Sequence, residues 1–304
     1  MTIPRRACVV LGLAALLVGA GTQADAQIED QLSAYTGPNA EGYLQPLATA
    51  IGADLNGGLF HTARVPLSGF HISIEIPLVA VLFAEEDATF EAVTESGFTP
   101  EQTVDAPTVV GSGEAVIVTG DEGTSFAFPG GFDLNSLALA VPQLRIGSFM
   151  GTEAIVRYAA FETGDAGLGD LSLFGIGARH NINQYFGETF PVDLAGGFFW
   201  QTFSLGDDLL DSDALSIGVQ ASKLYGTTFR FEPYVGVSYD SFSADVSYES
   251  EASGEPEQVD FSFDSESTAR LTLGAALSAA FVTGYAEYNI AGQNNFTLGV
   301  SFGN

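Results

Sequence analysis

The last thirty-five residues, 270–304, alternate with a period of two between apolar side chains and small or polar ones. The apolar positions fall in three successive segments, Leu271–Phe281, Ala286–Ile290 and Phe296–Phe302. The opposite positions are rich in Gly, Ser and Thr, and Gly292–Asn295 is a tight turn between two of the segments. Such alternation is typical of strands with one apolar face. Behind a secretory signal, it predicts a transmembrane β-barrel, apolar toward lipid, polar toward the lumen, and closed so that no strand edge is unpaired.

Residues 1–26 have the three parts of a secretory signal peptide. Arg5 and Arg6 form a basic start, residues 8–20 are apolar, and Ala24-Asp25-Ala26 is a small-residue cleavage site. The apolar run is too short for a transmembrane helix. Cys8 is the only cysteine, so we expect a mature chain without disulfides.

The length after the signal sets the size of the barrel. Removing 26 of 304 residues leaves 278, enough for roughly ten to fourteen strands of about ten residues each. Apolar residues make up 46% of the chain, yet they are spread too thinly for a membrane helix. We therefore predict an all-β, antiparallel transmembrane barrel of about twelve strands with a short N-terminal helical segment.

The charge balance is strongly acidic. Asp and Glu total 38 against 9 Lys and Arg, Lys223 is the only lysine, and the net charge is −29. This charge argues against nucleic acid, anionic surfaces and anion-selective porins as partners or functions, because anions would be repelled. Two interpretations remain, an acidic surface adapted to high salt and a cation-attracting lumen. The first is favoured because lysine is scarce along the entire chain.

Residues 27–69 do not have the barrel pattern. Residues 29–35 suit a short helix, and Asn39 is placed to cap a second helix that Asn56-Gly57-Gly58 would end. Tyr43, Leu44, Leu47, Ala48 and Ile51 would form its apolar stripe. The segment is expected to be either a small plug in the lumen or a cap over one barrel end.

Residues 70–304 form the predicted barrel. Its first strand covers 70–83, with a break at Pro77, and the acidic stretch 84–131 would be an extracellular loop, a raised hairpin or a constriction loop. The further strands are expected near 137–149, 152–162, 169–183, 190–205, 213–224, 227–240, 242–250, 258–266, 268–281, 283–291 and 294–303. The apolar phase changes at Asp240-Ser241, which predicts a bulge or turn there.

Several charged residues share the polar phase of these strands and should point into the lumen. They are Arg179, Arg230, Glu232, Asp240, Arg270 and Glu287. A charge on the lipid face would cost about 2–4 kcal/mol at the midplane. These residues could form a selectivity filter across the pore, or a salt-bridge network that fills a narrow barrel. The filling network is slightly favoured.

The sequence contains little evidence for a metal site or a catalytic site. The acidic loop with Asp207, Asp208, Asp211 and Asp213 offers carboxylates for Ca²⁺, but it lacks the spacing and glycine of an EF-hand loop. A solvated loop is the favoured interpretation. The three histidines are scattered, and phosphate loops, nucleophile elbows and zinc motifs are missing from the sequence. We therefore expect no cofactor, no catalytic residue and no enzyme activity.

Three stretches, 43–63, 142–157 and 167–180, resemble bacterial outer-membrane barrels of a Bacteroidota-type family without an assigned activity. The Gly167-Leu-Gly-Asp-Leu171 stretch and the N-terminal segment are also similar to channels of the fatty-acid-transporter type. The resemblance implies an outer-membrane location. Its partners would be the barrel-assembly machinery, outer-membrane lipid and lipopolysaccharide.

The sequence leaves two main functions open. The first is passive transport of small solutes or hydrophobic compounds, with 27–69 and 84–131 controlling access. The alternative is a non-conducting structural or adhesive surface barrel, and the two differ in lumen width and ion conductance. A third class, a secreted soluble β-sandwich, would lack an outward apolar belt about 25 Å tall.

Overall fold

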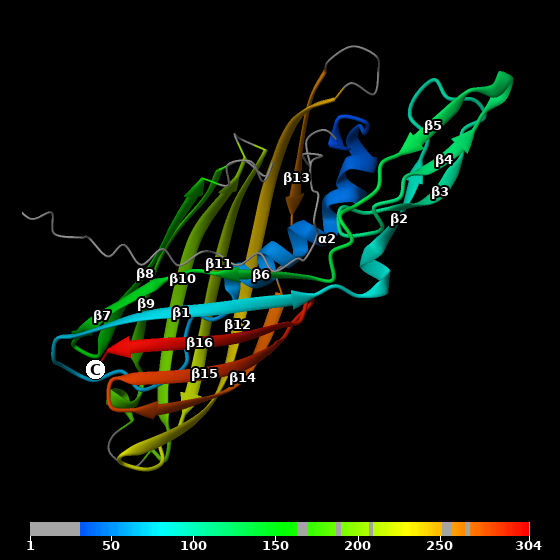
Figure 1. Ribbon diagram of the computed structural model, residues 1–304. Coiled ribbons are helices and arrows are strands. Elements are labelled where there is room, and N and C mark those ends of the chain that lie inside the picture. Colours follow the sequence, from blue (N-terminus) through cyan, green and yellow to red (C-terminus); the bar gives the residue numbers. More distant parts are fainter. Residues whose placement is uncertain are drawn as a thin grey trace, which may run out of the picture.

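The computed structural model describes residues 31–162, 170–186, 190–206, 209–250, 257–264 and 268–303. The expected signal peptide, 1–26, lies outside these residues. The described chain consists of one long helix, a large antiparallel sheet and two small hairpins (Figure 1). None of its helices is both long and apolar enough to cross a lipid bilayer.

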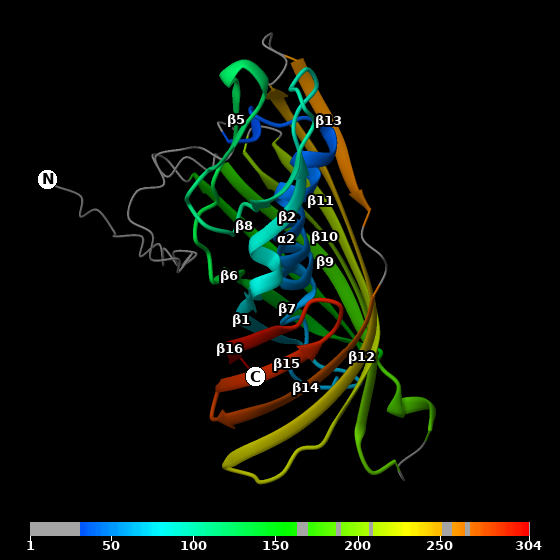
Figure 2. The ribbon, with the colours of Figure 1, turned by 90° about the vertical axis from the view of Figure 1, so that its right-hand side faces the viewer.

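Within the described residues, ten strands of the large sheet close into an antiparallel ring, and β6 and β13 are additional (Figure 2). The ring order is β1 (His71–Leu82), β7 (Gln143–Phe149), β8 (Thr152–Glu162), β9 (Asp170–Asn181), β10 (Asp193–Leu205), β11 (Leu210–Ser222), β12 (Phe229–Ser250), β14 (Thr268–Ala279), β15 (Val282–Ile290) and β16 (Asn295–Gly303). Pairing of β1 with β16 joins the first strand to the last. The predicted antiparallel barrel is therefore confirmed.

The strand expected at 137–149 is instead two strands. These are β6 (Ser136–Ala140) and β7, and both pair with β1. β7 pairs with His71–Glu75 and β6 with Leu78–Leu82, so β1 changes its neighbour at Pro77. Proline has no amide hydrogen to donate to a neighbouring strand, and Pro77 stands in the gap between the pairings with β7 and β6, while on its other side it lies opposite Gly299 of β16.

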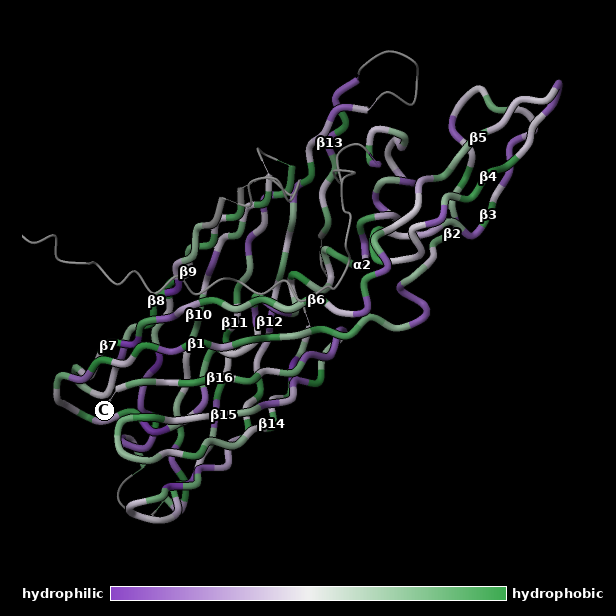
Figure 3. The backbone as a smooth tube through the Cα atoms, in the orientation of Figure 1, coloured by the Kyte–Doolittle hydropathy of each residue, from purple (hydrophilic) through white to green (hydrophobic). Residues whose placement is uncertain are grey.

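The strands expected at 227–240 and 242–250 are one continuous strand, β12, so the predicted bulge or turn at Asp240-Ser241 is wrong. Even-numbered residues of β12 face inward over its whole length, but the chemical character of these inner residues changes along the strand. Up to Asp240 the inner residues are polar or small, and from Phe242 to Tyr248 they are apolar. The outer residues change the opposite way, from Val235 and Val237 to polar ones. Figure 3 shows hydrophilic and hydrophobic residues alternating along the strands of the barrel. The apolar phase changes because the surroundings change, while the backbone remains regular.

The adjacent strand β11 inverts at the same level. Its outward residues are Asp211 and Asp213 at one end and Leu215, Ile217 and Val219 further along. Asp213 pairs with Ser243 across the sheet. The two inversions therefore form one boundary around the wall.

Large apolar side chains are exposed on the outer surface of the ring on one side of this boundary. They include Ile72, Ile74, Tyr158, Phe174, Ile176, Phe198, Trp200, Ile217, Val219, Val235, Val237, Leu271, Leu273, Tyr288, Ile290, Phe296, Leu298 and Phe302. This outward belt is the feature that a soluble β-sandwich would lack.

The helix α2 (Gly37–Asn56) runs along the inner side of the wall (Figure 2). Its predicted apolar stripe, including Leu44, Leu47 and Ile51, is buried with the inner residues of β9–β13. Asn39 is not its cap, because the helix begins at Gly37, with Thr36 at the N-cap position and Pro38 in the first turn, where proline is common. The Asn39 side chain instead bonds to the backbone of Val93, with Nδ2 2.7 Å from the carbonyl oxygen.

Residues 84–135 include two hairpins beyond the end of the barrel where α2 lies (Figure 1). The first is β2 (Thr89–Val93) with β3 (Thr103–Pro107), and the second is β4 (Val116–Thr119) with β5 (Ser125–Phe128). They share one apolar core with α2 that includes Tyr35, Tyr43 and Phe128. The Tyr43 hydroxyl donates to the Gly130 carbonyl at 3.1 Å, and burial raises the pKa of Tyr43.

We call this part of the molecule the head. It comprises residues 37–56, 84–135, 170–173, 202–206, 209–214, 241–250 and 257–264.

Candidate functional site

The lumen of the ring holds residues 53–66, which we call the lumen segment. It continues from the end of α2 and leads to the start of β1, so it runs through the barrel from the head to the opposite end. Buried backbone groups need hydrogen-bond partners. Since this segment belongs to no helix or strand beyond Asn56, its partners must come from the wall.

Donors from the wall bind the carbonyls of the lumen segment one after another. The pairs are Asn295 Nδ2 with Ala53 at 2.9 Å, Arg157 with Leu55 and Gly57 at 2.9 Å each, Arg270 with Asn56, Gln143 with Leu59 at 3.3 Å, Gln220 with Phe60 at 2.9 Å, Arg179 with Thr62, and Asn181 with Val65 at 2.6 Å. These seven donors come from six strands of the ring. The wall therefore supplies the hydrogen bonds that regular secondary structure would otherwise provide.

Acceptors from the wall bind the donors of the segment. Gly58 N donates to Glu287 Oε1 at 2.9 Å, and the Thr62 hydroxyl donates to Glu232. Two of the predicted luminal carboxylates are thus used to hold the segment.

One buried ion network joins β1, β7, β8 and β9. Arg145 Nη2 lies 2.7 Å from Glu75 Oε1, and Arg145 Nε lies 3.3 Å from Glu153 Oε1. Glu153 also pairs closely with Arg179 and has His71 Nε2 3.1 Å from Oε2. The two carboxylates and two arginines, Glu75, Glu153, Arg145 and Arg179, are all under one-tenth exposed, so each charge depends on its partners.

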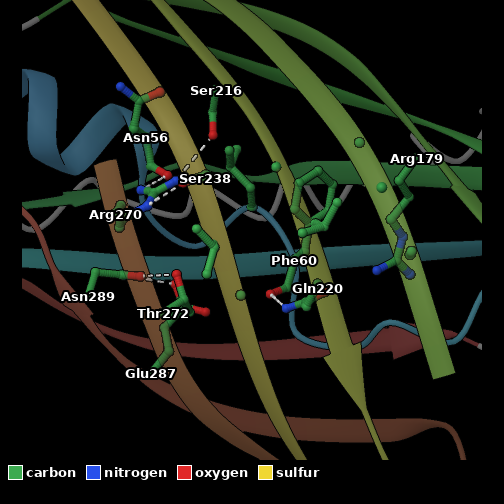
Figure 4. Close-up of a pocket in the computed structure, with 18 of the residues that line it drawn as sticks. Asn56, Phe60, Arg179, Ser216, Gln220, Ser238, Arg270, Thr272, Glu287 and Asn289 are labelled. Carbon is green, nitrogen blue, oxygen red and sulfur yellow. Dashed lines mark hydrogen bonds between the residues drawn. The ribbon is translucent and has the colours of Figure 1, made fainter. Parts of the chain in front are cut away.

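A second, separate pair lies nearer the head. Arg270 Nε is 3.1 Å from Asp240 Oδ2, and Arg270 Nη2 also contacts Ser216 Oγ at 3.2 Å (Figure 4). Arg230 does not join either group, because it lies at the start of β12, partly exposed, with Nη2 3.5 Å from the Ala280 carbonyl. The predicted luminal residues therefore form two clusters and anchors for the lumen segment, with Arg230 apart from them.

Glu75, Arg145 and Glu153 are luminal residues that are not among those predicted from the sequence. The alternation around β1 was available as a signal, since Ser73 and Glu75 occupy its polar phase between three isoleucines. Arg157 is also central, because its guanidinium binds two segment carbonyls and lies 5.3 Å from the Phe199 ring.

The buried charges of the lumen nearly balance. In the described part of the chain, four arginines (145, 157, 179 and 270) and six carboxylates (54, 75, 153, 232, 240 and 287) are buried there. The net charge of −29 therefore does not arise in the lumen.

Little open space remains at the level of the lumen segment. The cavity between Gly58, Phe60, Gln220 and Glu287 has a volume of about 50 Å³ (Figure 4), which leaves room for only a few water molecules. A larger cavity of about 380 Å³ lies nearer the head, between α2, the middle of β12 and the adjoining ends of β13, β14 and β16.

The predicted acidic loop is only partly described. Asp207 and Asp208 lie outside the described residues, and Asp211 and Asp213 point outward from β11. Trp200 Nε1 donates to Asp213 Oδ1 at 3.1 Å. Within the described ranges, no group of three or more His, Cys, Asp or Glu side chains is placed to hold a metal ion.

These features define an antiparallel β-barrel whose lumen is filled by its own N-terminal segment. Residues 5–304 match the model of a family of unknown function, DUF6588, so the chain belongs to that family. Among curated proteins, none matches the chain in sequence.

Several solved structures are similar at low scores. The outer membrane protease OmpT from Escherichia coli is 7% identical, with 82% of this chain and 99% of that chain covered and a TM-score of 0.34. The beta domain of the Bordetella autotransporter BrkA is 9% identical, with 77% and 99% covered and a TM-score of 0.30. A FadL homologue from Pseudomonas aeruginosa is 7% identical, with 89% and 94% covered and a TM-score of 0.17. No residue role is carried over from these proteins.

Proposed function

We propose that this protein is an outer-membrane barrel that is closed to diffusion in the state described here and that presents its head at the cell surface for contact or binding. The observation that carries the proposal is the lumen segment, which fills the ring and is bonded to side chains from most of its strands. Above it, the wall continues into a folded head with its own apolar core. This is the non-conducting structural or adhesive alternative of the sequence interpretation.

The outward apolar belt supports a location in lipid. Apolar side chains cover the ring up to the level where β11 and β12 invert, as expected where a strand leaves the bilayer. Trp200 lies at that level and bonds to Asp213, and tryptophan is enriched at membrane interfaces. We therefore place the membrane boundary near Asp213 and Asp240.

A charge placed on the belt tests this boundary. Val235 points outward within the belt and Ser243 points outward beyond the boundary. Val235→Arg should lower the free energy of unfolding by about 2–4 kcal/mol, whereas Ser243→Arg should change it by less than about 1 kcal/mol. Urea unfolding of the protein in lipid vesicles, followed by the single tryptophan, measures both. Equal effects of the two arginines would contradict the proposed boundary.

The orientation follows from the lengths of the connections. Short turns at 150–151 and 280–281 lie at the same end as Gly303, and residues 83–135 and β13 lie at the other. Since barrels have short periplasmic turns and longer extracellular loops, the head would face outward. The N-terminal segment would then enter the lumen from the outer side.

Cysteine labelling on intact cells tests this orientation, because the mature chain is expected to have no cysteine of its own. Thr103 in the first hairpin and Thr227 at the opposite end are both exposed. A membrane-impermeant maleimide should label Thr103→Cys on intact cells and Thr227→Cys only after lysis. Labelling in the reverse pattern would mean that the head faces the periplasm.

Conductance tests the proposed closure. The refolded mature protein in planar bilayers should give no steady current steps over a range of salt, because the segment occupies the lumen and the cavity beside it measures only about 50 Å³. Folding and insertion are checked in parallel by protease resistance in vesicles. Steady steps from the unaltered protein would overturn the proposal.

A second candidate is a channel for small solutes or hydrophobic compounds that opens by movement of the lumen segment. The observation that favours it is that the larger cavity is lined by Asn56, near the start of the segment, and by Arg270, which binds the Asn56 carbonyl. A ligand there would contact the same residues that keep the lumen closed. Current that appears only with a bound ligand would favour this function.

The charge distribution supports adaptation to high salt over cation selectivity, since the acidic excess is not in the lumen. The proposed outer-membrane location also implies contact with lipopolysaccharide and insertion by the barrel-assembly machinery. Nothing in the lumen geometry supports a catalytic role, and we propose none.

A further inference from the structure

We propose that the 380 Å³ cavity between the head and the lumen binds a neutral, hydroxyl-rich ligand of the size of a sugar. The inference rests on the proposed surface-binding function and gives it a ligand class. Pockets for small molecules commonly measure about 300–1,000 Å³, so the cavity of about 380 Å³ suits one or two sugar rings.

One wall of the cavity is the polar face of α2. Glu41, Gln45 and Thr49 are exposed and lie at successive turns of the helix, while the rest of α2 is largely buried. Residues four apart lie on the same helix face. The helix therefore directs a row of hydrogen-bonding groups into the cavity instead of toward the apolar core.

The floor of the cavity contains an unsatisfied buried acceptor. Asn56 is 4% exposed, and its Nδ2 lies 3.4 Å from the Ser241 carbonyl, but its Oδ1 accepts no hydrogen bond from the part of the chain that the structure describes. A buried polar atom without a partner costs about 1–3 kcal/mol, and such atoms in native proteins call for an explanation. A ligand hydroxyl would satisfy Asn56 in either orientation of its amide, because a hydroxyl both donates and accepts.

The charges around the cavity disfavour an anionic ligand. Arg270 is the basic residue among those that line it, and its guanidinium is already bound by Asp240, Ser216 and the Asn56 carbonyl. Glu41 and Asp240 also line the cavity. A carboxylate or phosphate would therefore find no unpaired cation and would face two acidic groups.

The remaining wall supplies apolar surface. Phe242 and Phe263 line the cavity from β12 and β13. A sugar ring has hydroxyls around its edge and apolar C–H groups on its faces, so it matches a site with aromatic groups on one side and amides and hydroxyls on the other. A fully apolar ligand would leave Asn56 and Gln45 without new partners.

Isothermal titration calorimetry on the full mature protein, folded in lauryldimethylamine oxide, tests the proposal. This detergent has no sugar headgroup that could compete. The probes are glucose, maltose, trehalose and maltohexaose, with decanoate and choline as anionic and cationic alternatives. We expect saturable heat with at least one mono- or disaccharide and none with decanoate or choline.

Two variants and a matched control locate the binding. Thr49→Trp fills the cavity from the exposed helix face, and Asn56→Leu removes the unsatisfied acceptor, so each should weaken sugar binding by about tenfold or more. Thr103→Trp places the same substitution on the exposed surface of a hairpin and should leave binding unchanged. Thr49→Trp also keeps the test informative if Asn56→Leu folds poorly.

The results with maltose and maltohexaose distinguish a free sugar from the end of a longer glycan. Comparable binding of maltohexaose and maltose would identify the end of a longer glycan as the source of the sugar, and loss with maltohexaose would identify a free sugar. No saturable heat with any sugar, binding unchanged in Thr49→Trp, or saturation by decanoate or choline instead would overturn the proposal. Each result is independent of the bilayer conductance, which tests the closed barrel by itself.

Discussion

Replacing Glu153 with leucine is expected to lower the free energy of unfolding by about 3–5 kcal/mol, the usual cost of removing one partner from a buried ion pair. Glu153 is 2% exposed and is shared by Arg145 and Arg179. Arg145 retains Glu75 at 2.7 Å, so Arg179 loses most. Its remaining contacts are the Thr62 carbonyl of the lumen segment and the Phe60 ring at 5.6 Å.

Urea unfolding in lipid vesicles, followed by Trp200, measures this loss. Glu153→Gln should recover part of it, because the amide oxygen still accepts a hydrogen bond but carries no charge. Glu249→Leu is the matched control, since Glu249 is exposed on the outer face of β12 beyond the belt, and it should change stability by less than about 0.5 kcal/mol. A loss below about 1 kcal/mol for Glu153→Leu would mean that water reaches the network and that the lumen is not filled.

The barrel itself could be predicted because its signal is local. Alternation with a period of two is a property of each strand separately, so segments such as 294–303 and 283–291 were placed close to β16 and β15. The number of strands was harder to predict. The change of the apolar phase at Asp240 is compatible with two physical causes. One is an extra residue in the strand, and the other is a change of the surrounding medium. Only the three-dimensional pairing distinguishes them, and it shows a regular strand that leaves an apolar environment.

The candidate site was predicted less completely, for a different reason. The phase of Arg179, Arg270 and Glu287 places them inside the ring, but the phase cannot say what they bind. Their partners are largely backbone atoms of the lumen segment, such as the carbonyls of Asn56 and Thr62 and the amide of Gly58. Every residue has these backbone groups, so no side-chain pattern marks them. The sequence could therefore suggest a plug or a cap without deciding between them.

The same backbone dependence explains why glycine occurs where the segment passes closest to the wall. Gly58 has φ +64°, and a Cβ there would lie 2.7 Å from Pro77 Cβ and 3.2 Å from Thr297 Cγ2. Gly58→Val should lower stability by about 2–6 kcal/mol, because a left-handed backbone at a β-branched residue and overpacking each cost about 1–3 kcal/mol. The bond from Gly58 N to Glu287 would also be lost if the segment moves away.

The variant should affect closure as well as stability. A segment that cannot pack against Pro77 no longer fills the ring, so Gly58→Val should give intermittent current steps in planar bilayers where the unaltered protein gives none. Gly284→Val is the matched control, because a Cβ at Gly284 has no atom within 4 Å and its backbone is not left-handed. Valine also suits a strand position, so this control should keep stability within about 0.5 kcal/mol and remain closed. Equal stability and no current for both valine variants would show that the segment does not pack against the wall at Gly58. Some other part of the chain would then have to close the lumen.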